Sequence, residues 1–352
     1  VTEFDADCNI TSQKAFESII RSSARLNYEE VDILFDGGKT NIPEDIAAIL
    51  EQMRILSQAL NRVRLARGYL QLNLPETEFI FDDEGHISDL SRSVETDSHA
   101  LIENFMLIAN EYVARQLGKQ STLYRIHEQP DLDRIEYVEE ILQIYGVKYK
   151  KNSNMNLLVQ NMLQALPDAN YHRVFDHMIL RSMKRARYSI QNAGHFGLAL
   201  VDYTHFTSPI RRLCDLVIHH QLKNHLHGQE SPFPGQVLFR YAGIATEKEQ
   251  IADESEREVE LKNKLIFMRK QLGADFTGII VAVRPNSLVV ELDRYPVTGI
   301  ITLASMKDDY YEYLDPYQQL IGKKKGKIFK LTDRVKVIVS QVTDDIYFQI
   351  IY

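Results

Sequence analysis

The most informative part of this chain is GHFGLALVDYTHFTSPIRRLCDLVIHHQL, residues 194–222. Its middle, YTHFTSPIRR, carries more polar donors than an ordinary core segment or an ordinary loop. Arg211 and Arg212 directly follow Ser208 and Pro209, at the start of an apolar helical run. Guanidinium groups beside the free N–H groups of a helix N-terminus suit an anion. The alternative is a capped helix whose arginines are only solvated.

The residues before this segment favour the anion-binding interpretation. Lys184, Arg185, Arg187 and Tyr188 precede a Gly-His-Phe-Gly sequence at residues 194–197, so cations, rings and glycines that would expose their backbone to a ligand gather in one stretch. Arginine pairs with phosphate oxygens in a bidentate manner, and aromatic rings stack on unpaired bases. The segment therefore predicts a nucleic-acid ligand.

Composition sets the broad class of the protein. The chain has 352 residues, 44% of them hydrophobic, which suffices for a sizeable core and excludes a disordered protein. The net charge of −8 argues against a nucleic-acid binder that relies on bulk charge, but it permits a local basic channel. Cys8 and Cys214 have no metal-ligand spacing, and no apolar run suits a membrane helix. We expect a monomeric protein of the cytoplasm.

The first part of the chain has mostly helical patterns. A helix starts at the Asn-Ile-Pro-Glu sequence of residues 41–44 and carries an apolar stripe to about residue 67. A strand pair is expected at residues 69–81 and 86–90. Further helices are expected at residues 96–117, 131–145, 154–166, 170–187 and 235–272.

The pattern changes at Gly273. Five short β-rich runs follow, FTGIIVAV, SLVVELD, VTGIITL, RVKVIVSQV and IYFQIIY, separated by turn residues. Five such strands predict a small closed barrel of the OB type. The expected fold class is α+β, with a largely helical domain at residues 1–272 and an OB barrel at residues 273–352.

The run RSMKRARYSIQNAGHFGLALVDYTHFTSPIRRLCDL closely resembles the hallmark of the ribonuclease II and ribonuclease R (RNB) family. SIIRSSARLNYEEV, LARGYLQLNLPE, LIENFMLIANEYVA and LYRIHEQPD resemble the same catalytic domain in order, and the terminal barrel resembles a ribosomal S-one-type RNA-binding domain. The resemblance implies a processive, hydrolytic 3′-to-5′ exoribonuclease that degrades single-stranded RNA to nucleoside 5′-monophosphates. The alternative is a catalytically inactive relative that serves as an RNA-binding or regulatory protein.

The family's magnesium site is implied to lie elsewhere. Its four aspartates belong to a segment of the type I-D-x-x-x-A-x-D-x-D-D-A, which this sequence lacks. Asp5 and Asp7 form a pair without further carboxylates nearby, so we expect no metal ligands in this chain. The sequence has no initiator methionine, and we expect it to be the C-terminal part of a magnesium-dependent parent chain. Alone, it should bind RNA without cleaving it.

The resemblance also assigns roles to single residues. Arg211 matches the arginine that holds the phosphate at the scissile end, where it would offset developing negative charge. Arg212 is a candidate for a neighbouring phosphate, with a salt bridge to Asp215 as the alternative. Glu256 matches a family glutamate near the terminal nucleotide, with a solvated helix face as the alternative.

Other candidates would contact ribose or bases. Tyr28 and Glu103 match the pair that the family places near the ribose hydroxyls, and the alternatives are a buried tyrosine in a capped helix and an ordinary surface glutamate. Gln71 stands where some members have a base-clamping ring. The predicted RNA contacts are completed by six residues of the motif and the barrel: Tyr188, His205, Ser208, Lys323, Lys324 and Lys325. His195 and His205 could be general bases, but a structural role is the simpler interpretation.

Overall fold

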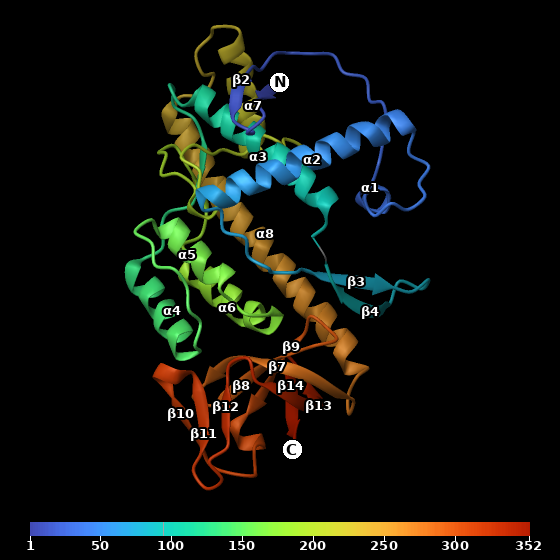
Figure 1. The fold of residues 1–352 in the computed structure, drawn as a ribbon, viewed down its shortest axis with the longest axis vertical. Helices are drawn as coiled ribbons and strands as arrows, with labels where there is room; N and C mark the ends of the chain where they lie inside the picture. The colour runs from blue at the N-terminus through green and yellow to red at the C-terminus, as the bar shows by residue number, and fades with distance from the viewer. Residues whose placement is uncertain (94) are drawn as a thin grey trace.

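The computed structural model describes residues 1–93 and 95–352, and it has the expected α+β architecture. A helical region precedes a barrel, and Figure 1 shows the barrel at the opposite end of the molecule from α7. None of the helices in these residues is both long and apolar enough to cross a membrane. The helices are α1 (Tyr28–Phe35), α2 (Glu44–Arg67), α3 (Asp97–Leu117), α4 (Leu132–Ile144), α5 (Met155–Gln164), α6 (Ala169–Ser182), α7 (Leu213–Leu226) and α8 (Gly235–Arg269).

Local capping residues explain where the first helices begin and end. Asn27 accepts a hydrogen bond from the backbone N–H of Glu30 at 2.8 Å, and the Glu30 carboxylate accepts one from the Asn27 N–H. This capping box satisfies two free donors at the start of α1. Helix α2 follows Pro43 and ends at Gly68, whose φ of 101° suits glycine.

The helical region also contains three two-stranded sheets. They are β1 (Thr2–Phe4) with β2 (Ile10–Gln13), β3 (Thr77–Phe81) with β4 (Ile87–Arg92), and β5 (Tyr124–Ile126) with β6 (Arg187–Ser189). The predicted hairpin is confirmed, but its first strand starts at Thr77 rather than at residue 69. The helix predicted for residues 170–187 ends at Ser182, because residues 187–189 pair with β5 instead.

The five predicted β-rich runs form a closed barrel. Its order is β13-β14-β9-β8-β7, with a parallel contact only between β14 and β9 among these pairs. The strands are β7 (Asp275–Arg284), β8 (Ser287–Leu292), β9 (Thr298–Thr302), β13 (Arg334–Val342) and β14 (Ile346–Ile351). An additional sheet, which the sequence pattern did not predict, contains β10 (Tyr311–Leu314), β11 (Gln319–Gly322) and β12 (Ile328–Lys330).

One carboxylate of the barrel joins it to two elements of the helical region. The Glu291 carboxylate on β8 lies 2.8 Å from Arg92 of β4 and 3.0 Å from Arg173 of α6. Arg173 also pairs with Asp293 at 2.9 Å. Burial raises the pKa of Asp293, but hydrogen bonds and the neighbouring arginines outweigh it and leave that pKa below its usual value. We call Arg92, Arg173 and Glu291 the arginine clamp.

Two glycines allow a matched test of the barrel core. A Cβ at Gly299 in β9 would lie 2.4 Å from the ring of buried Phe348, whereas one at Gly243 in α8 would meet nothing within 4 Å. Gly299→Ala should therefore cost about 1–3 kcal/mol of unfolding free energy through overpacking. Gly243→Ala should stabilise by up to about 1 kcal/mol, because alanine is the better helix former. Equal changes in urea unfolding would contradict this account.

Candidate functional site

The Gly-His-Phe-Gly sequence is held by contacts with His127, directly after β5, and with its own following residues. Gly194 has a φ of 70°, and a Cβ there would lie 3.0 Å from the Leu200 carbonyl oxygen. The Gly197 N–H donates to Nδ1 of His127 at 3.1 Å. The sequence suggested that these glycines expose backbone to a ligand. The structure instead uses them for close internal packing.

The Ser-Pro-Ile-Arg-Arg loop is held by Asp215, which is completely buried in the first turn of α7. One oxygen of Asp215 accepts the Ser208 N–H at 2.8 Å. Its two oxygens also accept from Nε and Nη2 of Arg212, each at 2.8 Å. The salt bridge weighed as the alternative for Arg212 is thus present. The Nε and Nη2 donors of Arg212 are therefore used inside the protein. A phosphate contact from Arg212 stays a prediction.

Arg211 differs from its neighbour. Its backbone N–H donates to the Ser208 carbonyl at 3.3 Å, which closes the turn, while its side chain is exposed. Within the described part of the chain, its guanidinium takes part in no hydrogen bond or ion pair. The loop therefore presents one guanidinium with its donors available, directly beside one that is fixed.

Tyr188 and His205 lie behind this loop. The Tyr188 hydroxyl and His205 Nδ1 are 2.8 Å apart, and the Arg125 guanidinium lies 4.8 Å from the Tyr188 ring centroid. Tyr188 is only 6% exposed, so its ring has no free face on which a base could stack. The predicted direct RNA contact of Tyr188 therefore lacks support, and burial is the reason.

The histidines of the motif are kept neutral. Burial, reinforced by nearby Arg212 and Arg125, lowers the pKa of His205 to about 2. Burial and His127 lower the pKa of His195 to about 3. Both rings pack edge-on against Tyr203, with centroids 5.7 and 5.2 Å away. Such weak bases favour the structural interpretation over general-base catalysis.

The structure places Tyr28 against α3, the helix that carries Glu103. Tyr28, the first residue of α1, stacks on His99 of α3 with ring centroids 3.9 Å apart, and Glu103 lies one turn further along α3. Tyr28 is 43% exposed, so the alternative of a buried tyrosine is wrong. Glu103 is also not an ordinary surface residue, because it accepts a hydrogen bond at 3.0 Å from the nearly buried Arg64.

Sequence reasoning missed Arg64. Its guanidinium donates to Glu103 and to Asn104 and lies 3.8 Å from the ring centroid of Tyr69. Burial, followed by the charge of Glu103, raises the pKa of Tyr69. A signal was present: Arg64 falls four residues after Leu60, on the apolar stripe of α2. A charge on a buried stripe indicates a partner, here the carboxylate predicted to approach the ribose.

Two further candidates lie elsewhere. Glu256 is exposed in the middle of α8 among other exposed charged residues, which is the solvated helix face considered for it. Gln71 lines a cavity of about 650 Å³ together with Arg92 and Arg173. A role for Glu256 near the terminal nucleotide stays a prediction, and Gln71 offers no ring with which to clamp a base.

The lysine run forms an exposed turn between β11 and β12, in the barrel and far from α7 (Figure 1). Lys323 pairs with Glu312 at 3.2 Å, and the backbone N–H groups of Lys324 and Lys325 donate to the Asp309 carboxylate. The Lys324 ammonium lies 5.4 Å from the ring centroid of exposed Tyr310. The turn is rigidly held while the lysine side chains face solvent.

The residues described do not fit the magnesium ion that the resemblance implies. Across residues 1–93 and 95–352, no three side chains of His, Cys, Asp or Glu form a group that could hold a metal. Asp5 accepts hydrogen bonds from the N–H groups of Asp7 and Asn9 at 3.0 and 2.8 Å, and the Asn9 contacts lower its pKa. This carboxylate stabilises the β1–β2 turn, so we derive no step through a metal here.

Comparison with known proteins identifies the family. Residues 1–228 match the RNB domain. The chain belongs to the RNB family. A ribonuclease R of Aquifex aeolicus is 35% identical over 350 residues, which cover 97% of this chain and 50% of that protein. The chain thus spans about half the length of the curated relatives it matches.

Solved RNB structures have the same fold. The RNase R of Mycoplasma genitalium in complex with ribose-methylated single-stranded RNA superposes with a TM-score of 0.90 at 26% identity, covering 99% of this chain and 57% of that one. The same enzyme in complex with double-stranded RNA gives a TM-score of 0.82 at 25% identity, with 99% and 59% coverage. RNB relatives of this fold therefore bind both forms of RNA.

Proposed function

We propose that this chain supplies the RNA-holding, C-terminal part of a processive 3′-to-5′ hydrolytic exoribonuclease. The whole enzyme would degrade single-stranded RNA to nucleoside 5′-monophosphates. The observation that carries the proposal is the open guanidinium of Arg211, presented by a loop that Asp215 holds from inside. Membership in the RNB family and the RNA complexes of its relatives support it.

In this proposal Arg211 is the catalytic residue of the chain. Its two-pronged donor group would hold the non-bridging oxygens of the scissile phosphate, and its charge would stabilise the negative charge that develops during hydrolysis. Magnesium would be the cofactor of the whole enzyme, held by carboxylates that are not among the residues described. Arg212 and Ser208 would fix the position of Arg211, through Asp215.

The barrel would capture and guide the RNA. Lys323, Lys324 and Lys325 place three cations on one exposed turn beside Tyr310, which suits a single strand with stacked bases. Because binding to phosphate releases counterions, replacing the three lysines should weaken binding at low salt. The salt slope should also fall by about 0.7 for each phosphate that the protein no longer neutralises. An unchanged affinity and an unchanged slope would contradict the guiding role.

The direct test uses the 352-residue chain itself. It should bind a labelled single-stranded RNA, more weakly as salt is added, and leave the 3′ end intact in magnesium. Gel shift across a salt series and denaturing gels measure the two properties. Metal-dependent shortening of the RNA would overturn the expected lack of a metal site, and absence of binding would overturn the RNA-holding role. In the parent reading frame, an aspartate-rich segment before this chain favours the enzyme over an inactive relative.

Tyr28 and Glu103 provide a test of sugar recognition. Both lie beside His99 on the α1–α3 surface, and a carboxylate and a hydroxyl suit contact with a 2′-OH. The double variant Tyr28→Phe with Glu103→Gln removes the hydroxyl and the negative charge, so it should reduce the preference for RNA over DNA of the same sequence. Competition binding measures the ratio, and an unchanged ratio would remove the pair from the recognition site.

A further inference from the structure

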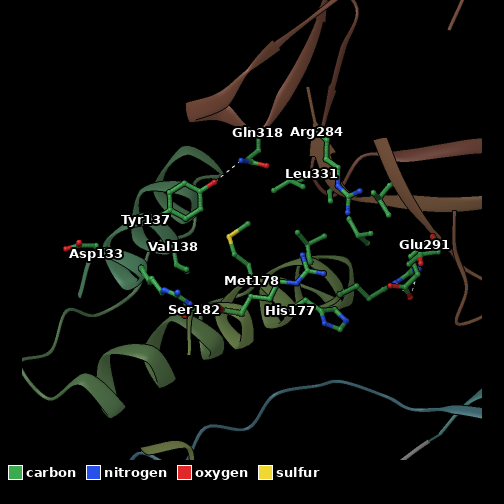
Figure 2. A pocket seen from close by; sticks show the side chains of 18 residues that line it. Asp133, Tyr137, Val138, His177, Met178, Ser182, Arg284, Glu291, Gln318 and Leu331 are labelled. Atoms are coloured by element: carbon green, nitrogen blue, oxygen red, sulfur yellow. Dashed lines mark hydrogen bonds and ion pairs between the residues drawn. The ribbon is translucent and has the colours of Figure 1, made fainter. Parts of the chain in front are cut away.

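A second part of the molecule has the form of a ligand site. A cavity of about 710 Å³ lies between α4 and α6 on one side and strands β7 and β8 of the barrel on the other. Its volume falls in the range of small-molecule and cofactor pockets, roughly 300–1,000 Å³. Figure 2 shows its lining side chains converging from both parts of the chain.

The cavity is rich in cations. Four arginines and two carboxylates line it, Arg134, Arg173, Arg181, Arg284, Asp133 and Glu291. Arg173 is engaged with Glu291 and Asp293 in the arginine clamp. Arg181 and Arg284 are exposed, and in the described residues their guanidinium groups make no hydrogen bond or ion pair. Two guanidinium groups, one on α6 and one on β7, are therefore available to an anion in the cavity.

Most of the remaining lining is apolar or aromatic. The Tyr137 hydroxyl accepts a hydrogen bond from Nε2 of Gln318 at 2.8 Å, which fixes the tyrosine ring relative to the barrel. Figure 2 shows Tyr137, Met178 and Leu331 around the open centre, with Arg284 on the barrel side. His177 also lines the cavity, and partial burial lowers the pKa of its ring, which favours the neutral form.

We propose that this cavity binds one nucleotide unit. Arg181 and Arg284 would hold the phosphate, because arginine matches phosphate oxygens in charge and geometry. The base would stack on the fixed ring of Tyr137 and contact Met178, whose flexible thioether packs well against aromatic rings. The unit could be a free nucleoside 5′-monophosphate or one nucleotide of an RNA strand. The residues involved are not those on which the proposed function rests.

The test is calorimetric titration of the full 352-residue chain with AMP, and separately with a ten-nucleotide oligo(A). Adenosine and inorganic phosphate are titrated in parallel. Arg181→Ala and Arg284→Ala should each weaken the ligand that uses the site by about 10- to 100-fold, the usual effect of losing a charged hydrogen bond. Arg62→Ala, an exposed arginine of α2 outside the cavity, is the matched control. Thr298→Trp, at an exposed strand position lining the cavity, should block it by bulk alone.

The titrations with AMP and with oligo(A) distinguish the two sources of the nucleotide. Weakening of AMP by the cavity variants assigns the site to free mononucleotide, and weakening of oligo(A) alone assigns it to the RNA strand. The proposal is overturned if neither ligand responds to the cavity variants more than to Arg62→Ala. It is also overturned if AMP binds no more tightly than adenosine and phosphate while oligo(A) is unaffected. AMP binding that is lost with Arg211→Ala but kept in the cavity variants would place the nucleotide at the loop before α7 and refute this site.

Discussion

Arg211→Ala, introduced into an exoribonuclease that contains this chain, should slow cleavage of a bound RNA 3′ end by about 100- to 1000-fold. The affinity for RNA should change much less. Many phosphates along the strand share the binding, but only one carries the charge that develops in the transition state. Because the Arg211 side chain is exposed and its guanidinium makes no hydrogen bond or ion pair among the described residues, folding should be unaffected.

Single-turnover cleavage at saturating enzyme measures this effect separately from binding. Arg211→Lys is the informative companion, since it retains the charge but lacks the planar fork that matches two phosphate oxygens. It should recover only part of the rate. Unchanged single-turnover cleavage in Arg211→Ala would remove this residue from the catalytic site, even if RNA binding fell.

Asp215→Ala should cost about 3–5 kcal/mol of unfolding free energy. The variant leaves the Arg212 guanidinium, only 22% exposed, without its counterion, and it leaves the Ser208 N–H without its acceptor. Removing one partner of such a pair is costly because the remaining charge stays desolvated. Urea unfolding followed by circular dichroism measures the loss.

Two controls keep this prediction specific. Asp7→Ala removes an exposed carboxylate and should change stability by less than about 0.5 kcal/mol. The double variant Asp215→Ala with Arg212→Ala should be less destabilised than the sum of the single variants, because neither charge is then left alone. A loss below about 1 kcal/mol in Asp215→Ala would show that the loop does not depend on this carboxylate.

Local patterns were sufficient to predict much of this fold. The β-rich composition of the terminal runs and the turn residues between them predicted all five barrel strands, and a spacing of three residues was enough to suggest the Arg212–Asp215 pair. The strands β10 to β12 were missed because each has only three or four residues, too few to show a period. The helix predicted for residues 170–187 extends past Ser182 to Arg187, because the partner of Arg187 in β5, Ile126, lies about 60 residues away in the sequence.

The sequence predicted less of the candidate site than of the fold, because the burial of a side chain depends on the whole tertiary structure. Tyr188 and an exposed tyrosine such as Tyr28 are alike in the sequence, and only tertiary packing makes one a core ring. Gly197 was taken for a backbone open to a ligand, since the sequence does not show that His127 occupies its N–H. The cavity between α6 and the barrel combines segments more than 100 residues apart, so no local motif describes it.

The arginine clamp has a consequence for how this protein can be rebuilt. An OB barrel is commonly treated as an exchangeable module, but here Arg92 also donates to the carbonyls of Leu292, Asp293 and Tyr295. A foreign barrel grafted after α8 would have to reproduce both the carboxylate of Glu291 and the backbone path of residues 292–295, whose carbonyls accept from Arg92. Without them the two arginines would lose these acceptors and stay desolvated at the interface, and the chimera would lose the ionic part of the contact between its barrel and the helical region.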